Sequence, residues 1–206
     1  MAMSKITKIS AQKNTERLNI YLDGVFAFGI RQELLGDYDL HVGKELKKNE
    51  IARINKEDEI KRCLDKAYRY LFYRPRSEKE VTDKLLEKYP EKTVAAALKK
   101  LKEYKYVDDR AFIKFWLDSR ANSRGPALLR LELIQKGIPK TLIEESLSSI
   151  NKEALIEDAL KLVRGKKKYR DLDANDLYKK VAPFLSRRGY SYDVIKIVLK
   201  SMKSEN

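Results

Sequence analysis

The sequence predicts a mainly α-helical protein, with three tandem three-helix repeats of the helix-turn-helix kind forming an elongated, curved array behind a small N-terminal β-hairpin or meander domain. Three observations predict this fold class. A hairpin pattern occurs near the N-terminus, apolar residues recur at helical spacing from about residue 58 onward, and the helical part repeats with a period of about 45 to 50 residues. Eight Gly and five Pro among 206 residues are few, which disfavours a turn-rich sandwich or barrel.

The N-terminal domain, expected over residues 1–57, is built around one hairpin. Residues 17–22 alternate polar and apolar side chains, and residues 25–30 resume the strand pattern. Between them stands Asp23-Gly24, a pair typical of a two-residue hairpin turn. This is the clearest β signal in the chain.

Two further segments complete this domain. Ile6 and Ile9 are candidates for a third strand, and residues 31–54 are expected to form short helices joined at Gly36 and Gly43. Because an isolated hairpin is only marginally stable in water, the small sheet should pack against the segment that follows it.

The helical part is expected to divide into three-helix repeats at residues 58–107, 108–150 and 151–206. In the second and third repeats a helix ends before Gly137 and Gly189, and apolar residues follow each Gly at the same offsets. The first repeat is one residue tighter and carries Lys88 at the Gly position. Such units cannot bury their apolar faces alone, so we expect them to stack on one another.

Local signals mark where the helices begin and end. Ser77 and Glu80 form a capping box, in which the Ser77 hydroxyl accepts from the Glu80 amide while the Glu80 side chain reaches back. Asp108 or Asp109 can cap the next helix. Two further boundaries in the second repeat are Gly125-Pro126 and Gly137-Ile138-Pro139.

The chain is strongly basic, with 45 Lys and Arg against 31 Asp and Glu and a formal net charge of +14. A protein with this excess is expected to meet polyanions. The single Cys and single His exclude a disulfide framework and a zinc site built from these residue types. Cys63 is interpreted as a small core residue, and His41 stands in a loop-like stretch without a nucleophile elbow. We expect no metal and no cofactor.

No catalytic constellation is recognisable. Asp108-Asp109 suggests a metal-dependent nuclease at first sight, but neighbouring carboxylates at a helix start are usually caps, and no Walker loop is present. We expect no signal peptide, since the N-terminal residues lack its pattern, and no apolar run approaches the 18 residues of a membrane span. We expect a non-enzymatic, monomeric, cytoplasmic protein without membrane contact.

Basic residues gather in each of the three repeats. Because every phosphate that is neutralised releases counterions, such an array suits a polyanion with its own periodicity. The run Lys166–Arg170 is the strongest candidate, since no acidic residue stands between its lysines and Gly165 precedes them, and we expect it to be a mobile patch. The candidate contacts are Arg69, Arg74, Arg76, Arg120, Arg124, Arg130, Lys166, Lys167, Lys168 and Arg170. For Arg76 or Arg120 the alternative is a structural bridge to an acidic neighbour within the same repeat.

Aromatic residues near these cations invite a base-stacking interpretation. They occur at helical spacing among Leu and Ala residues, which favours core packing instead. The residues interpreted as core are Tyr70, Tyr73, Phe112, Phe115 and Trp116.

Four groups of residues in the helical part carry a family resemblance. They are Ala67-x-x-Tyr70-Leu71-x-x-Arg74-x-Arg76-Ser77-x-x-Glu80-Val81 with Leu85, then Leu101-x-x-x-Lys105-Tyr106-Val107-Asp108-Asp109-x-x-Phe112 with Trp116 and Arg120, then Gly125-Pro126, then Leu133-Ile134-x-Lys136-Gly137-Ile138. Together they resemble the RecX family of recombination regulators over about residues 58–202, and the hairpin domain resembles the N-terminal extension of some members. Tyr89-Pro90 and Pro126 depart from the family pattern, in turns only.

The resemblance implies a non-enzymatic regulator of RecA. It would engage the RecA nucleoprotein filament, along its groove or at its end, and restrain the ATPase, strand-exchange and coprotease activities. It would thereby act in homologous recombination, DNA repair and the SOS response. Weak, sequence-independent binding to single- or double-stranded DNA accompanies this expectation, because the chain is so basic.

The alternative is a direct DNA-binding tandem helix-turn-helix protein without a RecA partner. It would need Arg, Asn or Gln side chains on a recognition helix to read base edges. The helices expected after Ser77 and at Pro126 carry mostly Lys, Glu and Leu, so sequence-specific readout is weakly supported. A nuclease is a third candidate. Inhibition of the DNA-dependent ATPase of RecA at substoichiometric amounts, without hydrolysis by the protein itself, separates these functions.

Overall fold

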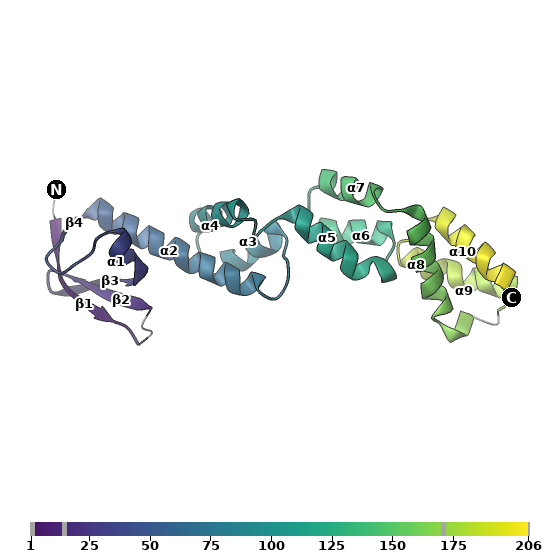
Figure 1. The fold of residues 1–206 in the computed structure, drawn as a ribbon, viewed down its shortest axis with the longest axis horizontal. Helices are drawn as coiled ribbons and strands as arrows, with labels where there is room; N and C mark the ends of the chain where they lie inside the picture. The colour runs from purple at the N-terminus through teal and green to yellow at the C-terminus, as the bar shows by residue number, and fades with distance from the viewer. Residues whose placement is uncertain (1–2, 14–15, 170–171, 206) are drawn as a thin grey trace. The chain divides into compact units, whose positions relative to one another are not determined.

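The computed structural model describes residues 3–13, 16–169 and 172–205 (Figure 1). The chain forms two compact units, which we describe separately. Unit 1 comprises Met1–Tyr70 and Lys84–Tyr104, and unit 2 comprises Leu71–Asp83 and Lys105–Asn206. Helix α3 (Glu78–Leu86) contributes residues to both units.

Unit 1 begins with a four-stranded antiparallel sheet in the order β3-β2-β1-β4. Its strands are β1 (Met3–Ala11), β2 (Arg17–Leu22), β3 (Val25–Arg31) and β4 (Glu45–Lys47). Asp23 and Gly24 both have positive φ angles, 50° and 86°, which a two-residue hairpin turn of this kind requires. The predicted hairpin is confirmed. The third strand is confirmed too, because Ile6 and Ile9 lie in β1 and pair with β2.

One face of the sheet is closed by helices α1 (Glu33–Asp37) and α2 (Lys48–Leu71). Ile20 and Ile30 from the sheet, Leu34 from α1 and Ile54 from α2 are fully buried in one cluster. The sheet therefore packs on the segments that follow it, as expected of a hairpin too small to be stable alone.

The expectation of short helices over residues 31–54 is wrong in part. Gly36 lies inside α1, strand β4 follows, and α2 begins already at Lys48. The Glu50 carboxylate accepts a hydrogen bond from the Lys47 amide at 2.8 Å, which satisfies a backbone donor at the start of α2. The apolar spacing is sparse at this end because only Ile51 and Ile54 pack on the sheet while charged neighbours face water.

Helix α4 (Glu91–Glu103) is tied to α2 by polar contacts. Thr93 Oγ1 donates to Glu59 at 2.6 Å, and Lys100 Nζ lies 3.4 Å from Glu57. Cys63 on α2 is fully buried, which confirms its interpretation as a core residue. Burial raises the pKa of its thiol to about 11, so the thiol is protonated and unreactive at neutral pH.

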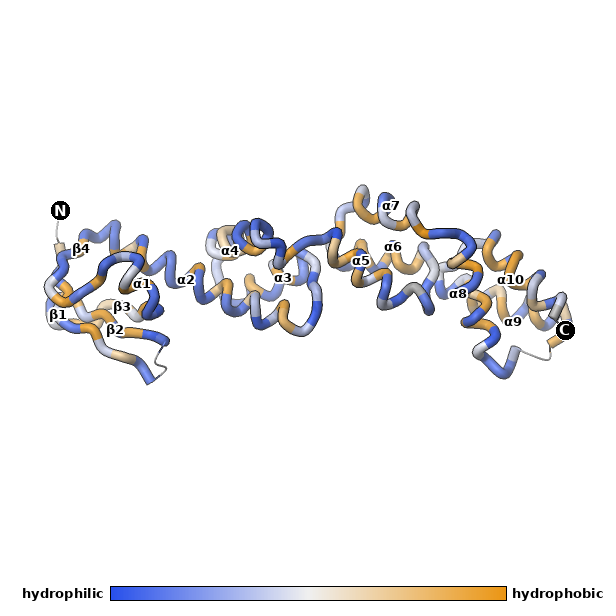
Figure 2. Tube along the Cα trace, viewed as in Figure 1, coloured by the Kyte–Doolittle hydropathy of each residue, from blue (hydrophilic) through white to orange (hydrophobic). Residues whose placement is uncertain are grey.

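Unit 2 contains the second and third three-helix repeats (Figure 1). The second consists of α5 (Asp109–Arg120), the 3₁₀ turn η1 (Ala121–Ser123), α6 (Pro126–Gln135) and α7 (Lys140–Ser148). The third consists of α8 (Lys152–Arg164), the 3₁₀ turn η2 (Lys167–Tyr169), α9 (Ala174–Arg187) and α10 (Tyr192–Glu205). Each repeat has its own apolar core, and Figure 2 shows the apolar residues recurring along these helices.

The predicted helix boundaries in unit 2 are confirmed. Ser77 Oγ accepts from the Glu80 amide at 3.2 Å, and the Ser77 amide donates to the Glu80 carboxylate at 3.3 Å, which completes the capping box. Of the two candidate caps for α5, Asp108 takes the role, accepting from the Arg110 amide at 2.8 Å. Asp109 instead accepts from the Glu78 amide at 2.9 Å.

The second and third repeats end one helix in the same way. Gly137 and Gly189 have φ angles of 77° and 85°, and the following amides of Ile138 and Tyr190 reach back to carbonyls five residues earlier, at 3.1 and 3.2 Å. In the first repeat the Tyr89 amide reaches back four residues, to Leu85, at 3.0 Å. That turn is shorter, as predicted.

Candidate functional site

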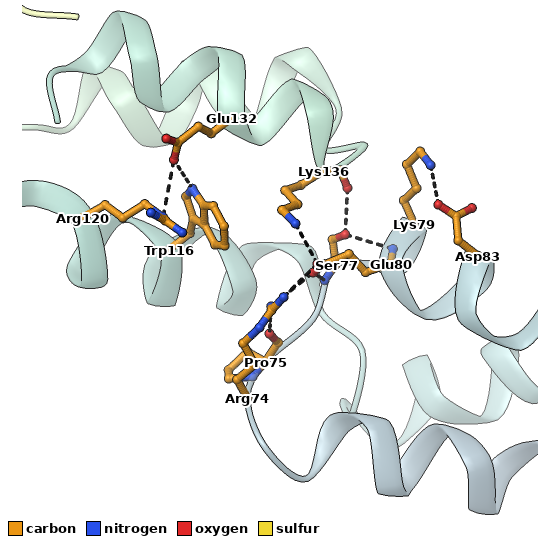
Figure 3. Close-up of polar contacts among 10 residues, drawn as sticks. All are labelled: Arg74, Pro75, Ser77, Lys79, Glu80, Asp83, Trp116, Arg120, Glu132 and Lys136. Carbon is orange, nitrogen blue, oxygen red and sulfur yellow. Dashed lines mark hydrogen bonds and ion pairs between the residues drawn. The ribbon is translucent and has the colours of Figure 1, made fainter. Parts of the chain in front are cut away.

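Two partly buried glutamates in unit 2 hold several of the predicted basic residues (Figure 3). The first is Glu80 on α3, whose side chain is 14% exposed. Arg74 donates to its two carboxylate oxygens through both Nη atoms, at 2.9 and 3.2 Å. Lys136, at the end of α6, donates from Nζ to Glu80 at 2.8 Å.

Ser77, the residue before α3, also connects this helix to the second repeat. Ser77 Oγ donates to the carbonyl of Lys136 at 2.7 Å (Figure 3). Burial alone would raise the pKa of Glu80, but hydrogen bonds from Arg74 and Lys136 outweigh it and lower this pKa to about 2. Glu80 is therefore an ionised structural centre rather than an acid or base that works near neutral pH.

The second glutamate is Glu132 on α6, whose side chain is 13% exposed. It accepts a hydrogen bond from the indole nitrogen of Trp116 at 2.9 Å and forms an ion pair with Arg120 at 3.4 Å (Figure 3). Arg124 forms a second ion pair with the same carboxylate. The Arg120 guanidinium also lies over the Trp116 ring, 3.9 Å from its centroid. Lys136 Nζ lies 5.2 Å from the same centroid.

These contacts favour a structural role for Arg74, Arg120 and Arg124. Each cation neutralises a carboxylate that is mostly removed from water, and breaking such pairs is costly. Their side chains are still 27, 32 and 35% exposed, so a ligand can reach them. Their role as contacts to a partner stays a prediction.

The other predicted arginines of the described chain differ in their surroundings. Arg130 donates to Glu144 at 2.7 and 2.8 Å in an exposed pair, which contributes little stability. Arg76 is half-buried beside the capping box. Arg69 belongs to unit 1, where its Nε donates to the carbonyl of Asp65 at 3.3 Å.

The predicted lysine run lies in the third repeat. Lys167 and Lys168 are exposed on η2, and Tyr169 beside them is 4% exposed. Lys166 Nζ lies 5.6 Å from the Phe184 ring centroid, and Lys168 Nζ 5.0 Å from that of Tyr169. The run thus lies at a turn next to a buried tyrosine, and its expected mobility stays a prediction. Arg170 lies outside the described residues.

The interpretation of the aromatic residues as core is correct for Phe112 and Trp116, which are 0 and 7% exposed. It is wrong for Tyr73, which is 82% exposed beside Phe72, itself 85% exposed. Helix α2 ends at Leu71, so both residues fall in the loop that follows, where helical spacing no longer decides their burial.

One cluster of basic residues in unit 1 has no counterpart among the sequence predictions. Arg17 and Arg62 both bind the carboxylate of Asp58, which is 2% exposed. The four-residue spacing of Asp58 and Arg62 on a helix is a sequence signal for this pair. Arg17 is 41 residues from Asp58, so no local pattern shows that contact.

The described residues contain neither a metal-binding cluster nor a membrane-spanning helix. The described residues include no group of three or more His, Cys, Asp or Glu side chains that could hold a metal ion. Among the helices of the described segments, none is both long and apolar enough to cross a membrane.

The fold and the cations around Glu80 and Glu132 define a class of protein: a basic protein with tandem three-helix domains that follow a small antiparallel sheet domain. Comparison with known families makes this specific. The descriptions that match are the Regulatory protein RecX N-terminal domain at residues 4–47 and the first, second and third three-helix domains of RecX at residues 63–101, 108–147 and 153–199.

Curated relatives with the same family name match nearly the whole chain. Regulatory protein RecX of Bacillus velezensis (strain DSM 23117 / BGSC 10A6 / LMG 26770 / FZB42) is 38% identical over 210 residues, covering 99% of this chain and 80% of the relative. Regulatory protein RecX of Clostridium botulinum (strain Eklund 17B / Type B) is 36% identical over 203 residues, covering 96% of each. The chain belongs to the RecX family of regulatory proteins.

Solved structures support the fold. A crystal structure of regulatory protein RecX, 33% identical, superposes with a TM-score of 0.76 and covers 96% of this chain and 99% of that one. RecX from Lactobacillus salivarius, 24% identical, gives a TM-score of 0.66 over 72% of this chain and shows the likeness of fold alone.

Proposed function

We propose that the protein is a non-enzymatic, cytoplasmic regulator of the RecA recombinase, which binds the RecA nucleoprotein filament and restrains its ATPase, strand-exchange and coprotease activities. The observation that supports this most is the match to the RecX family in the N-terminal domain and in all three three-helix domains. Weak DNA binding without sequence preference is the second part of the proposal, and the net charge of +14 supports it.

The exposed cations of the third repeat are the proposed contacts to DNA. Lys167 and Lys168 on η2 and Lys179 and Arg187 on α9 are exposed. Lysines on a short turn supply point charges that neutralise phosphates without reading bases, so this surface suits sequence-independent binding. Lys166 and Arg170 complete the run in the sequence.

The arginines of the Glu80 and Glu132 clusters have a different proposed role. Arg74, Arg120 and Arg124 pair with the two glutamates while 27 to 35% of each side chain stays exposed. We propose that they position the surface that meets the filament and contact carboxylates or phosphates there through their outer edges. Arg69, Arg76 and Arg130 stay candidate contacts.

A salt titration tests the DNA-binding part. The triple variant Lys166→Ala, Lys167→Ala, Lys168→Ala should bind DNA more weakly and with a flatter dependence on salt, because about one counterion is released for each phosphate neutralised. Its melting should be unchanged, since exposed substitutions usually alter stability by about 0.5 kcal/mol or less.

The matched control removes three exposed lysines from α10 of the same repeat, Lys196, Lys200 and Lys203. It loses the same charge, so an equal flattening would show that net charge alone matters. A strong preference for one duplex sequence at physiological salt would contradict the proposal and favour a direct DNA-binding regulator.

Sedimentation tests the partner. RecA filaments assembled on single-stranded DNA with a slowly hydrolysed ATP analogue should pellet more of the protein than the same DNA without RecA, at one salt concentration. Equal amounts in both pellets would contradict the RecA part of the proposal while leaving DNA binding intact.

A further inference from the structure

A cleft in unit 1 is lined by four arginines. It has a volume of about 470 Å³ and lies between the sheet and α2. Its cationic walls are formed by Arg17, Arg31, Arg62 and Arg69. Tyr68 and the carboxylates of Glu16 and Asp65 also line it, so arginines outnumber acidic residues two to one in the lining.

A buried carboxylate organises this cleft. Asp58 on α2 is 2% exposed and accepts hydrogen bonds from both Nη atoms of Arg17 at 3.2 Å and from the Arg31 amide at 2.9 Å. It also forms an ion pair with Arg62, whose Nε lies 2.9 Å from Asp58 Oδ2. Arg17 also donates to the carbonyl of Gly29 at 2.9 Å. A buried charge must be paired in this way, so Asp58 fixes guanidinium groups from β2 and α2 beside β3.

The outer wall of the cleft is a face of α2. Arg62 and Arg69 are seven residues apart, two helical turns, and therefore lie on the same side of the helix. Both are exposed, and 43% of the Arg62 side chain is reachable by solvent although its Nε is held by Asp58. Ordered arginines that keep their outer edges in water are well suited to bind phosphate through paired hydrogen bonds.

A second cleft adjoins the first and differs in chemistry. It has a volume of about 640 Å³, shares Arg17 and Arg62 with the first, and is also lined by Phe26, Gln12 and Asn55. Phe26 is 53% exposed, so an aromatic face stands in water next to side-chain amides. Bases stack on aromatic rings and hydrogen-bond to side-chain amides, so this lining favours a nucleotide over a bare anion.

We propose that unit 1 binds the backbone of single-stranded nucleic acid, with a phosphate in the arginine cleft and the adjoining base against Phe26. The inference rests on the proposed DNA binding and adds a second binding surface to that of the third repeat. It gives unit 1, through the sheet and α2, a role as a nucleic-acid module.

The test is binding of a fluorescein-labelled oligothymidylate to the full chain, followed by fluorescence anisotropy. Arg62→Ala with Arg69→Ala should weaken binding about tenfold, or about 1.4 kcal/mol. The matched control is Lys92→Ala with Lys99→Ala on α4, a pair of exposed cations in the same unit with the same seven-residue spacing. It should weaken binding by about twofold at most, because these lysines lie outside both clefts.

Further variants separate a binding role from a structural one. Because Arg62 also pairs with Asp58, Arg69→Ala and Phe26→Ala are measured singly, and each should weaken binding with unchanged melting. Arg62→Lys with Arg69→Lys keeps the charge but loses the paired donors, so it should bind more weakly than the unmodified chain and more tightly than the double Ala variant.

The outcomes are distinct. An unmodified chain that fails to bind the oligonucleotide overturns the DNA part of the proposed function and this inference with it. Unchanged binding by the double Ala variant, or equal losses in it and in the Lys92 and Lys99 control, overturns this inference alone. Displacement of the oligonucleotide by polyglutamate or by inorganic phosphate at equal charge concentration would assign the cleft to acidic protein or free anion and also overturn it.

Discussion

At the scale of single residues, the carboxylate of Glu80 holds the start of α3 against the second repeat. It accepts hydrogen bonds from Arg74, Lys136 and the Ser77 amide, and the opposite charges keep it ionised (Figure 3). Such a group links stability to pH, because folding holds the carboxylate in its charged form.

Replacing Glu80 tests this link. Its folded pKa of about 2 lies below its usual value of 4.5, so its contribution is fully present above about pH 4.5 and is lost as the pH falls toward 2. The difference between these pKa values corresponds to about 3 kcal/mol. We expect Glu80→Gln to lower the free energy of unfolding by about 2 to 3 kcal/mol at pH 7 and by progressively less below pH 4.5, as measured by chemical denaturation.

The control is Glu144→Gln, which removes an exposed carboxylate that pairs with Arg130 in the same two-oxygen manner. Its effect on the free energy of unfolding at pH 7 should be smaller, because both partners stay hydrated. If Glu80→Gln were as stable as the unmodified chain at pH 7, the Glu80 cluster would not hold the junction.

Removing the cations around Glu132 gives a second prediction. Arg120→Ala with Arg124→Ala leaves a carboxylate that is 13% exposed without its ion pairs, so we expect a loss of about 2 to 3 kcal/mol of stability. Trp116, the one Trp in the sequence, hydrogen-bonds to Glu132 and reports on the site by its fluorescence.

Adding Glu132→Gln to that double variant should restore part of the stability, because no unpaired charge remains. If the Arg120 and Arg124 double variant melted like the unmodified chain, these arginines would have no structural role and would act only in binding a partner.

Sequence reasoning predicted the local half of these clusters. The spacing of Ser77 and Glu80 predicts the capping box, which the structure confirms. Lys136 is 56 residues from Glu80, and no spacing rule brings two such residues together. The arginines were therefore predicted to form a basic surface. Their ion pairs with Glu80 and Glu132 form only when the chain packs into its tertiary structure.

At the scale of elements, the helices of the second and third repeats follow from apolar spacing and from turn residues. Pro126 begins α6 and the positive φ of Gly137 ends it, as predicted. Strand β4 and the first turns of α2 were missed. Three residues are too few for a strand pattern, and the charged start of α2 shows little amphipathic period.

Gly189 is predicted to be the most sensitive turn residue. A Cβ at this position would lie 2.3 Å from the Leu128 backbone nitrogen, and its φ of 85° disfavours any side chain. Gly189→Ala should lower the melting temperature markedly, with a cost of at least about 1 to 2 kcal/mol. Gly36→Ala in α1, where nothing lies within 4 Å, is the control and should leave melting unchanged or raise it. Equal melting of the two variants would contradict this.

At the scale of the whole molecule, the basic composition and the family resemblance both point to a nucleoprotein partner. A charge of +14 predicts a polyanionic partner, and the motifs from Ala67 to Ile138 predict the RecX family, which the comparisons confirm. The elongated, curved form of the repeat array stays a prediction. The arginine clefts of unit 1 could not be predicted, because β2, β3 and α2 meet there only after folding.

The central claim is regulation of RecA, and the DNA-dependent ATPase of RecA on single-stranded DNA tests it most directly. We expect the purified protein to inhibit this ATPase when RecA is in molar excess and to hydrolyse no ATP itself. The Lys166, Lys167 and Lys168 triple Ala variant should inhibit more weakly than the Lys196, Lys200 and Lys203 control. An unchanged ATPase rate, at salt concentrations where the protein binds DNA, would contradict the account.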